Sequence, residues 1–258
     1  MSENLMRLVP PIKRARSFYL YDEKDRRYLD LYLDGGRGLC GHRPNGLSNV
    51  LKNTISRGLF APYPSVYSNR LNKVLKKGFP QFTYRAVYRS LDSFEKALGE
   101  PASFFDTAKT AESGESSLWR PFLPVPEESG RLLVLFPFPG VDAVAVLSRK
   151  DELPPSDYLS PVTESGLVRS WFDLQTRLKE SDRSVWSLLD DTGHWERSGP
   201  YLFPRCSERE YGDLFRFYLD KGILISPLYD KPSVIAVDIK EGSLKRLKKA
   251  LKGVSHDQ

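Results

Sequence analysis

The sequence contains few of the residues that bind metals or form disulfides. Its two cysteines, Cys40 and Cys206, give neither a disulfide framework nor a four-ligand metal cluster. A three-histidine site would need His42, His194 and His256 together, and the last of these lies in a polar tail. We therefore expect no metal centre. The scarcity of cysteine favours a reducing compartment, so the expected location is the cytoplasm.

Long apolar segments are also missing. The first residues, MSENLMRLVPPIKRAR, are interrupted by Pro10 and Pro11 and lack the apolar core of a signal peptide. No window approaches the roughly 18 uninterrupted apolar residues of a membrane span. Lys and Arg number 39 against 33 Asp and Glu, and a net charge of +6 is too weak a bias to indicate a nucleic-acid partner. The sequence thus predicts neither a membrane nor a nucleic acid as a partner.

The remaining composition is that of an ordinary globular protein. With 258 residues, of which 40% are hydrophobic and 28% charged, the chain is long enough for one large or two modest domains. Residues 18–33 alternate apolar and polar side chains around a polar turn at Asp22, which predicts a β-hairpin. A Gly-rich connection follows. Helical spacing then predicts two amphipathic helices that end at Gly58 and Gly78.

The middle of the sequence predicts a small sheet with long loops. Tyr84–Tyr88 has the pattern of a short strand, and Ser90 can cap a helix that follows it. Residues 99–130 are rich in proline, serine and glutamate, so we expect loops there. Two further strands are predicted at Arg131–Phe136 and Val141–Leu147, the first with the continuous apolar run of a buried sheet position.

The last third of the sequence alternates helices and strands. Thr163 is the expected N-cap of a long helix, and Ser207-Glu208-Arg209-Glu210 is a capping box for a helix that ends before Gly222. Residues 223–225 and 234–237 then predict two strands. A final helix is predicted from Ser243, with Leu244, Leu247 and Leu251 facing inward.

Two segments, one near each end of the chain, carry a family resemblance. FYLYDEKDRRYLDLYLDGGRGLCGHRP resembles the opening of fold-type I pyridoxal-phosphate enzymes, above all class III aminotransferases and glutamate-semialdehyde aminomutases. GPYLFPRCSEREYGDLFRFYLDKGILISP is similar to the strand, helix and Gly-initiated strand of their C-terminal small domain. The matching positions in the first segment are Asp22, Tyr28, Asp30, Gly35, Gly36, Gly38, Gly41, His42 and Pro44.

The resemblance implies a fold class and a domain plan. The expected fold is α/β and of the pyridoxal-phosphate-dependent transferase type, with an intact α+β small domain and a truncated large-domain sheet. Residues 1–78 would form the N-terminal part of the small domain and an interface segment. Residues 79–162 would be a vestigial large domain, and residues 163–258 the linking helix and the C-terminal small domain.

The phosphate cup of the family is altered in the residues themselves. In the family a Ser-Gly-Thr-like turn opens the helix after the first large-domain strand, and the matching place here begins at Ser90. Leu91 replaces the glycine that lets the backbone approach a phosphate, and Asp92 adds a negative charge where a dianion would lie. We therefore interpret Ser90, Leu91 and Asp92 as a vestigial cup that binds no cofactor.

The other two contacts that the cofactor needs are also missing from the sequence. The Schiff base requires a lysine, and the matching stretch Leu132–Pro137 has none. Lys150 is the fallback candidate, although it lies beyond the following strand. The ring nitrogen requires a carboxylate, and Asp106 is the only aspartate in the shortened gap between cup and lysine, with no convincing strand around it. We expect no catalytic residue and no cofactor.

The Gly-rich connection is the expected interface loop. The resemblance places Gly35, Gly36, Gly38, Gly41, His42 and Pro44 in a loop that borders the active site or a second subunit. The alternative for His42 is a structural role in which its side chain hydrogen-bonds the turn. Aromatic residues make up 12% of the chain, and some of them, such as those in the Phe60, Tyr63, Tyr67 group, could line a dimer interface.

Three hypotheses for the function follow. The first is a non-catalytic, aminotransferase-like protein that binds a second copy of itself or an intact aminotransferase-like subunit. The second is a minimal pyridoxal-phosphate-dependent aminotransferase or aminomutase that uses a relocated lysine, with Lys150 the first candidate. The third is an interaction protein unrelated to aminotransferases.

Overall fold

The computed structural model describes residues 4–109, 115–180, 183–236 and 239–252. The chain divides into two compact units: unit 1 comprises Met1–Arg43 and Lys179–Gln258, and unit 2 comprises Pro44–Leu178. The borders of these units, at residues 43 and 178, differ from the expected domain borders at 78 and 162. The roles assigned to the three expected segments remain predictions.

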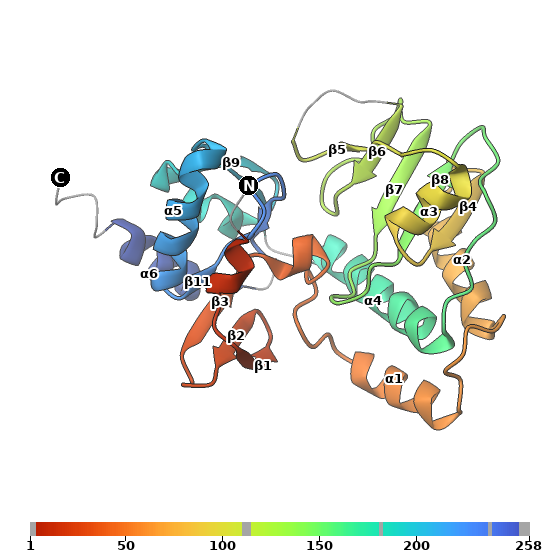
Figure 1. Ribbon diagram of the computed structural model, residues 1–258, viewed down its shortest axis with the longest axis horizontal. Coiled ribbons are helices and arrows are strands. Elements are labelled where there is room, and N and C mark those ends of the chain that lie inside the picture. The colour runs from red at the N-terminus through yellow and green to blue at the C-terminus, as the bar shows by residue number, and fades with distance from the viewer. Residues whose placement is uncertain (1–3, 110–114, 181–182, 237–238, 253–258) are drawn as a thin grey trace. The chain divides into compact units, whose positions relative to one another are not determined.

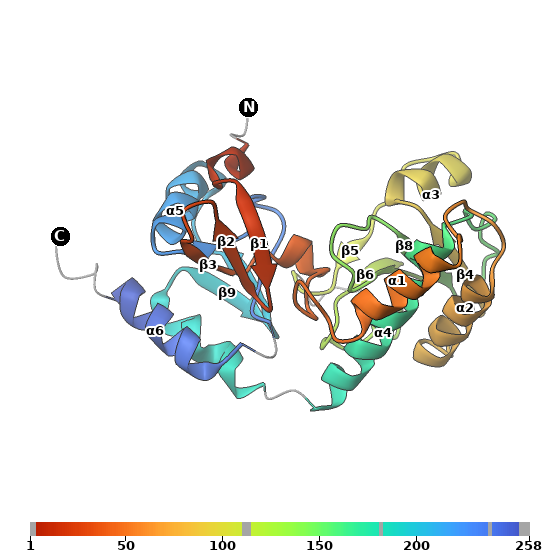
Figure 2. The ribbon, with the colours of Figure 1, turned by 90° about the horizontal axis from the view of Figure 1, so that it is seen from below.

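Unit 1 contains a four-stranded sheet with the order β1-β2-β3-β11. β2 (Tyr19–Asp22) and β3 (Arg27–Asp30) form the predicted antiparallel hairpin, and β11 (Ile223–Leu224) pairs in parallel with β3. β1 (Ile12–Arg16) lies at the edge next to β2, as Figure 2 shows. The sequence did not indicate β1, because all five of its residues are exposed and the alternation that marks a half-buried strand is missing.

The other elements of unit 1 mostly follow the predicted order. The capping box is confirmed, since the Ser207 N–H donates to Glu210 Oε2 over 2.9 Å. The final helix begins at Glu241 rather than Ser243, and Leu244 is fully buried as expected. Val237 and the side chains of Leu247 and Leu251 lie outside the described residues. The bounds are η1 (Leu5–Leu8), η2 (Leu33–Gly36), η3 (Ser184–Thr192), β9 (Trp195–Ser198), β10 (Tyr201–Pro204), α5 (Glu208–Asp220), β12 (Ser233–Val234) and α6 (Glu241–Lys252).

Unit 2 contains a five-stranded sheet with the order β4-β8-β7-β6-β5 (Figure 1). The predicted strands are confirmed as β4 (Tyr84–Tyr88), β7 (Arg131–Leu135) and β8 (Val144–Ser148). The expectation of loops throughout 99–130 was wrong, because β5 (Phe105–Asp106) and β6 (Ser116–Trp119) lie within it. These strands have two and four residues, which is too short for an alternating pattern to stand out from their proline- and serine-rich surroundings.

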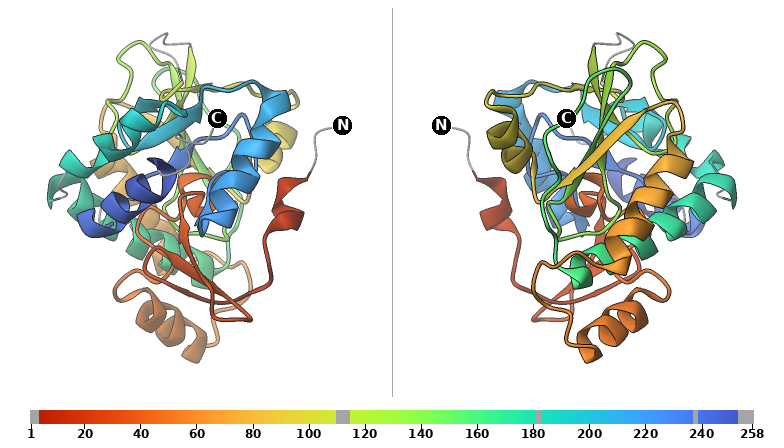
Figure 3. Two further views of the ribbon diagram at one scale, coloured as in Figure 1. Left: turned by 90° about the vertical axis from the view of Figure 1, so that its left-hand side faces the viewer. Right: turned by 90° about the vertical axis from the view of Figure 1, so that its right-hand side faces the viewer.

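Helices cover both faces of this sheet. Figure 3 shows α3 (Leu91–Leu98) on one face and α2 (Val66–Gly78) on the other, and α4 (Pro161–Glu180) packs on the α2 side. α1 (Leu47–Ser56) precedes α2 in the chain, as predicted. The expected N-cap of α4 was wrong by three residues: the Thr163 N–H donates to Ser160 Oγ, which places the cap at Ser160 and proline at the first helical position.

The core of unit 2 follows from strands that are apolar on both faces. On the α3 face Phe94 packs in one cluster with Ala86, Tyr88, Leu133, Val144 and Val146. On the opposite face four rings contact one another: Phe79 lies 5.0 Å from Trp119 and 5.7 Å from Trp171, and Phe136 lies 6.3 Å from Trp171, between ring centroids. All five residues of β8 are buried, so this strand needs apolar side chains on both sides.

We expect Gly166→Ala to destabilise unit 2. A Cβ atom at Gly166 in α4 would lie 2.3 Å from Cε1 of Phe138, so the ring or the helix must shift. Overpacking of this kind costs about 1–3 kcal/mol of unfolding free energy. Urea denaturation followed by tryptophan fluorescence measures it. Gly130→Ala is the matched control, because its nearest neighbour would be 3.4 Å away, and its stability should stay the same or rise by up to about 1 kcal/mol.

Candidate functional site

The carboxyl edge of the unit 2 sheet is the candidate site. β4, β5, β6 and β7 run in the same direction and only β8 opposes them, so the carboxyl ends of four strands lie along one edge. In open α/β sheets this is the edge at which ligands bind. The turn between β4 and α3 is also the place where the resemblance puts the phosphate cup.

The three residues of the expected cup have structural roles at this turn. Ser90 Oγ accepts a hydrogen bond from the Ser93 N–H over 3.1 Å and so acts as the N-cap of α3. Leu91 packs against the apolar cluster on the α3 face of the sheet. Asp92 is exposed in the first turn of the helix, where a negative charge stabilises the helix dipole. All three therefore contribute to the start of α3.

A carboxylate from a distant part of the chain accepts hydrogen bonds at this turn. Asp157 Oδ2 accepts from the Arg89 N–H over 2.8 Å and from the Ser93 hydroxyl, and the Arg89 Nε lies 3.5 Å away. The backbone holds the carboxylate in place, because the Asp157 N–H donates to the Val87 carbonyl over 2.9 Å. An intramolecular anion thus takes the donors that a turn at a helix N-terminus offers to a phosphate.

The pKa of Asp157 reflects these contacts. Burial by itself would raise the pKa of this carboxyl group. The hydrogen bonds from the Arg89 N–H and the Ser93 hydroxyl, together with the charge of Arg89, outweigh burial and hold the pKa below its ordinary value of 3.8. The group is therefore a carboxylate at neutral pH.

A second ion pair lies at the same edge. Arg120, just beyond β6, donates from Nε to Asp106 Oδ1 over 3.0 Å and from Nη2 to Asp106 Oδ2 over 2.6 Å. The guanidinium is 3% exposed and the carboxylate 13% exposed. Burial alone would raise the pKa of Asp106, but the hydrogen bonds and charge of Arg120 lower it overall. Asp106 lies on β5, so the view that no strand surrounds it was wrong, and its carboxylate is committed to Arg120 in a bidentate pair.

The stretch that matches the Schiff-base position is part of the hydrophobic core. Leu132, Val134 and Phe136 have no exposed surface. Leu132 and Val134 on β7 and Phe136 just beyond it lie on the aromatic face of the sheet, so a lysine at any of them would bury an ammonium group without a partner. The structure therefore offers no amine in this stretch.

Two lysines flank the sheet at other places. Ser148 at the end of β8 pairs with Tyr84 and Arg131, the first residues of β4 and β7, so Lys150 lies at the opposite edge, roughly 13 Å of strand from the candidate site. Lys109 follows β5 and shares the carboxyl edge. β5 is four strands from β4, however, which separates Lys109 from the α3 turn by roughly 19 Å.

The expected interface loop is organised within the chain by Asp30. This carboxylate, 2% exposed, accepts hydrogen bonds from the N–H groups of Tyr32 and Leu33 over 2.8 and 2.9 Å, and His42 Nε2 lies 3.0 Å from its other oxygen. The backbone from Leu33 to Gly36 has positive φ at every residue. Strain at Leu33, which is a poor residue for this conformation, persists because Asp30 holds its N–H.

The glycines and Pro44 complete the loop. At Gly41, with φ of +80°, a Cβ atom would lie 3.0 Å from the Ser17 carbonyl oxygen, so only glycine fits between the loop and the turn that joins β1 and β2. Gly38 donates to the Leu33 carbonyl, and Gly35 and Gly36 form the left-handed turn. These contacts agree with the structural alternative for His42. The interface role of Gly35, Gly36, Gly38, Gly41, His42 and Pro44 remains a prediction.

Sequence reasoning missed Asp157 and Arg120. Asp157 is 67 residues from the turn whose hydrogen bonds it takes, and no local pattern marks it. Arg120 follows a strand that was itself unrecognised. Among the described residues, no three histidine, cysteine or acidic side chains are grouped so that they could bind a metal ion. The helices in the described part of the chain also lack a segment long and apolar enough to span a bilayer.

The residues at the carboxyl edge do not fit pyridoxal phosphate. The anion position at the α3 turn holds the carboxylate of Asp157, and the matching lysine position is apolar core. The one aspartate that could face the ring nitrogen is paired with Arg120. We therefore derive no cofactor chemistry at this edge.

Comparison with solved structures defines the fold. Ornithine aminotransferase of Toxoplasma gondii matches with a TM-score of 0.68 at 12% identity, over 96% of this chain and 91% of that one. Acetylornithine aminotransferase of Elizabethkingia anophelis matches with a TM-score of 0.64 at 11% identity, over 94% and 92%. A glutamate-1-semialdehyde aminomutase of Pseudomonas aeruginosa gives 0.64 at 11%, over 94% and 86%. The mixed α/β fold is thus that of class III pyridoxal-phosphate-dependent aminotransferases.

Sequence relatives define the family more narrowly. No protein-family profile matches the chain. An uncharacterised protein of Borreliella burgdorferi is 31% identical over 93% of this chain and 90% of its own, and one of Treponema pallidum is 29% identical over 87% and 88%. The chain belongs to the family of the Borreliella burgdorferi protein. A glutamate-1-semialdehyde 2,1-aminomutase of Heliobacterium modesticaldum is 35% identical over only 27% of this chain and 16% of its own.

We expect Asp157→Asn to destabilise unit 2 in a pH-dependent way. The substitution keeps the size of the side chain but removes the charge from its hydrogen bonds, at a cost of about 1–3 kcal/mol at pH 7. Folding lowers the pKa of Asp157. The stabilisation that its carboxylate adds to the free energy of unfolding is therefore complete above about pH 4, the pKa of the unfolded state, and is lost as the pH falls through the lower pKa of the folded state. The difference between wild type and variant should therefore shrink in acid, as measured by urea denaturation at several pH values.

Asp151→Asn is the matched control for this experiment. Asp151 is 64% exposed and lies 3.9 Å from Arg131, so its loss should cost less than about 1 kcal/mol. Equal effects of the two substitutions, or an Asp157→Asn effect that does not depend on pH, would contradict the assigned role of Asp157.

Proposed function

We propose that this protein is a catalytically inactive member of the aminotransferase fold that acts by binding a protein partner. One observation carries the proposal: the carboxylate of Asp157 accepts the hydrogen bonds that the β4–α3 turn would give to a cofactor phosphate. A phosphate and a carboxylate in contact repel each other strongly away from bulk water. The cofactor would have to displace a group that is tied to the backbone of β4.

The positions of the lysines support the same conclusion. Catalysis by a relocated amine would need that amine close to a phosphate held at the same sheet edge. Lys150 is exposed at the opposite edge, and Lys109 lies four strands from the α3 turn. Neither side chain is long enough to cross these distances. Neither of these two lysines therefore supports the hypothesis of a minimal enzyme.

Exposed aromatic side chains support a binding role. Phe60, Tyr63 and Val66, in and after the connection between α1 and α2, are 60%, 62% and 59% exposed. Tyr67, the third aromatic residue of this group, is buried at 7% exposure and belongs to the core. Aromatic residues are enriched at protein interfaces, and three neighbouring exposed apolar side chains favour a partner surface.

The proposed partner is a second copy of the chain, with an intact aminotransferase-like subunit as the other candidate. The resemblance implies that one loop contributes to recognition of this partner. The loop contains Gly35, Gly36, Gly38, Gly41, His42 and Pro44. The scarcity of cysteine supports a cytoplasmic location.

Addition of pyridoxal phosphate tests the absence of catalysis. We expect no Schiff base in unit 2, so borohydride reduction followed by peptide mass mapping should find no lysine of unit 2 modified in stoichiometric amount. Lys150→Ala should behave as wild type does. A band that reduction traps on one lysine of unit 2 would overturn the proposal, and its loss in Lys150→Ala would establish the relocated lysine.

Light scattering after size exclusion tests the partner. We expect a mass twice that of one chain, and Phe60→Ser combined with Tyr63→Ser should shift the equilibrium toward the monomer by at least tenfold, because two exposed rings are removed from the interface. Phe172→Ser is the control, since Phe172 is an aromatic residue of similar exposure, 52%, on another element, α4. A wild-type monomer would exclude the second copy and leave the aminotransferase-like subunit as the partner to test.

A further inference from the structure

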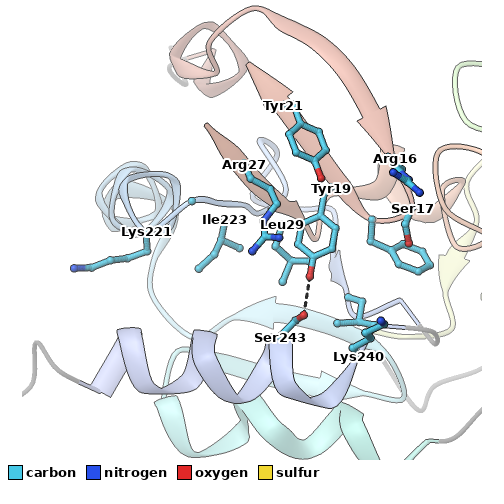
Figure 4. Close-up of a pocket in the computed structure, with 13 residues that line it drawn as sticks. Arg16, Ser17, Tyr19, Tyr21, Arg27, Leu29, Lys221, Ile223, Lys240 and Ser243 are labelled. Carbon is cyan, nitrogen blue, oxygen red and sulfur yellow. Dashed lines mark hydrogen bonds between the residues drawn. The ribbon is translucent and has the colours of Figure 1, made fainter. Parts of the chain in front are cut away.

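A basic pocket lies in unit 1, between the sheet of β1, β2 and β3 and the start of α6 (Figure 4). Its volume is about 620 Å³, which is within the range of small-molecule sites. The pocket is separate from the carboxyl edge of the unit 2 sheet and shares no residue with it. Its chemistry is therefore independent of the proposed function.

The sheet register gathers arginine and tyrosine on one face. Arg14 and Arg16 on β1 are directly opposite Tyr21 and Tyr19 on β2, and Arg27 on β3 is opposite Tyr21 on the other side. Residues directly opposite each other in antiparallel strands share a face. The Arg14 guanidinium lies 4.2 Å from the centre of the Tyr21 ring, and that of Arg27 lies 4.7 Å from the centre of the Tyr19 ring. The rings thus fix the orientation of both guanidinium groups.

The pocket is positively charged. Arg16, Arg27, Lys221 and Lys240 line it, and no acidic residue does so in the described part of the chain. None of these four forms an ion pair with a described carboxylate. The nearby Glu241 instead pairs with Lys245 over 2.7 Å. Four like charges around one small cavity repel each other, and a bound anion would relieve this repulsion.

Hydroxyl groups and a helix terminus complete the set of donors. The Tyr19 hydroxyl donates to Ser243 Oγ over 2.7 Å, which leaves the Ser243 proton free for an acceptor in the pocket. α6 has 12 residues and begins at Glu241, so its positive N-terminal end lies next to Lys240 and Ser243. In Figure 4, Arg27 and Lys240 lie on either side of the Tyr19–Ser243 hydrogen bond, while Lys221 extends away from it.

The remaining wall is apolar. Leu29, Ile223 and Ile239 are 6%, 2% and 5% exposed and line the same cavity. A free phosphate ion would fill only a small part of 620 Å³ and leave this wall in water. A ligand with one anionic end and an organic body uses both kinds of surface.

We infer that this pocket binds a small phosphate ester through Arg27, Lys240 and the Ser243 hydroxyl. A phosphate group presents several oxygens to several donors, which suits a planar guanidinium, an ammonium group and a hydroxyl that line one cavity. The organic body of the ester packs against the wall of Leu29, Ile223 and Ile239. The phosphate ester can be a nucleotide or a sugar phosphate, and both share this chemistry.

Titration calorimetry on the full chain tests the pocket with AMP, glucose 6-phosphate, pyrophosphate and citrate as probes. We expect saturable binding of at least one ester at one site per chain, weaker binding of pyrophosphate, and no binding of citrate. The ester that binds more tightly identifies the type of organic body. No saturable binding of either ester, or citrate binding as tight as that of the esters, would overturn the inference.

Substitutions connect the binding to the pocket. Arg27→Gln combined with Lys240→Gln should weaken ester binding at least tenfold, because two of the three phosphate contacts are lost. Arg57→Gln combined with Lys73→Gln removes two exposed cations of unit 2, so it is the matched control and should change affinity less than twofold. All four positions are exposed, and thermal melting checks that each variant folds. Equal weakening in both double variants would mean that net charge rather than this pocket binds the ligand.

A single-stranded oligonucleotide of ten thymidines distinguishes a nucleic-acid surface. Arginine and tyrosine on an exposed sheet face can also stack bases. Tight binding of the oligonucleotide without binding of either ester would overturn the inference in favour of that surface. Pyridoxal phosphate is itself a phosphate ester, so the lysine found by peptide mapping distinguishes the two proposals. Modification of Lys221 or Lys240 would report this pocket in unit 1, and modification of a lysine of unit 2 would overturn the proposed function.

Discussion

The hydrogen bonds of Asp157 determine what the carboxyl edge of the unit 2 sheet can bind. A turn between a strand and a helix attracts an anion whatever its source, because its N–H and hydroxyl groups point outward at the positive end of the helix. Here the anion belongs to the chain itself and is anchored to β4 by its own backbone. The donors of this turn therefore stabilise the folded state of unit 2.

The other groups at this edge also have partners within the chain. Asp106 and Arg120 neutralise each other in a bidentate pair, and the β7 residues that could have carried an amine fill the aromatic face of the sheet. Both faces of the sheet are covered by helices, and the core between them is packed by apolar and aromatic side chains of the chain itself.

Unit 1 has the opposite electrostatic character. Its buried carboxylates are paired, Asp30 with the loop and His42 and Asp22 with Arg26, whereas several of its cations around the basic pocket have no described acidic partner. In unit 2 the donors at the sheet edge bond to carboxylates of the chain itself. In unit 1 the cations around the basic pocket remain open to an anion from outside the chain. For a family whose sequence relatives are uncharacterised, this contrast directs attention to the small sheet of unit 1 rather than to the large one.

The sequence by itself determined the elements that depend on neighbouring residues. The hairpin, the helices of unit 2, the caps at Ser90 and Ser207 and the apolar strands β7 and β8 all follow from local spacing and capping chemistry. The absence of a lysine in Leu132–Pro137 was also visible directly. Only the tertiary structure placed Asp157 at the α3 turn, Asp106 on a strand beside Arg120, and Lys150 at the wrong edge of the sheet. These facts depend on strand order and register, which bring together residues far apart in sequence and which no local pattern encodes.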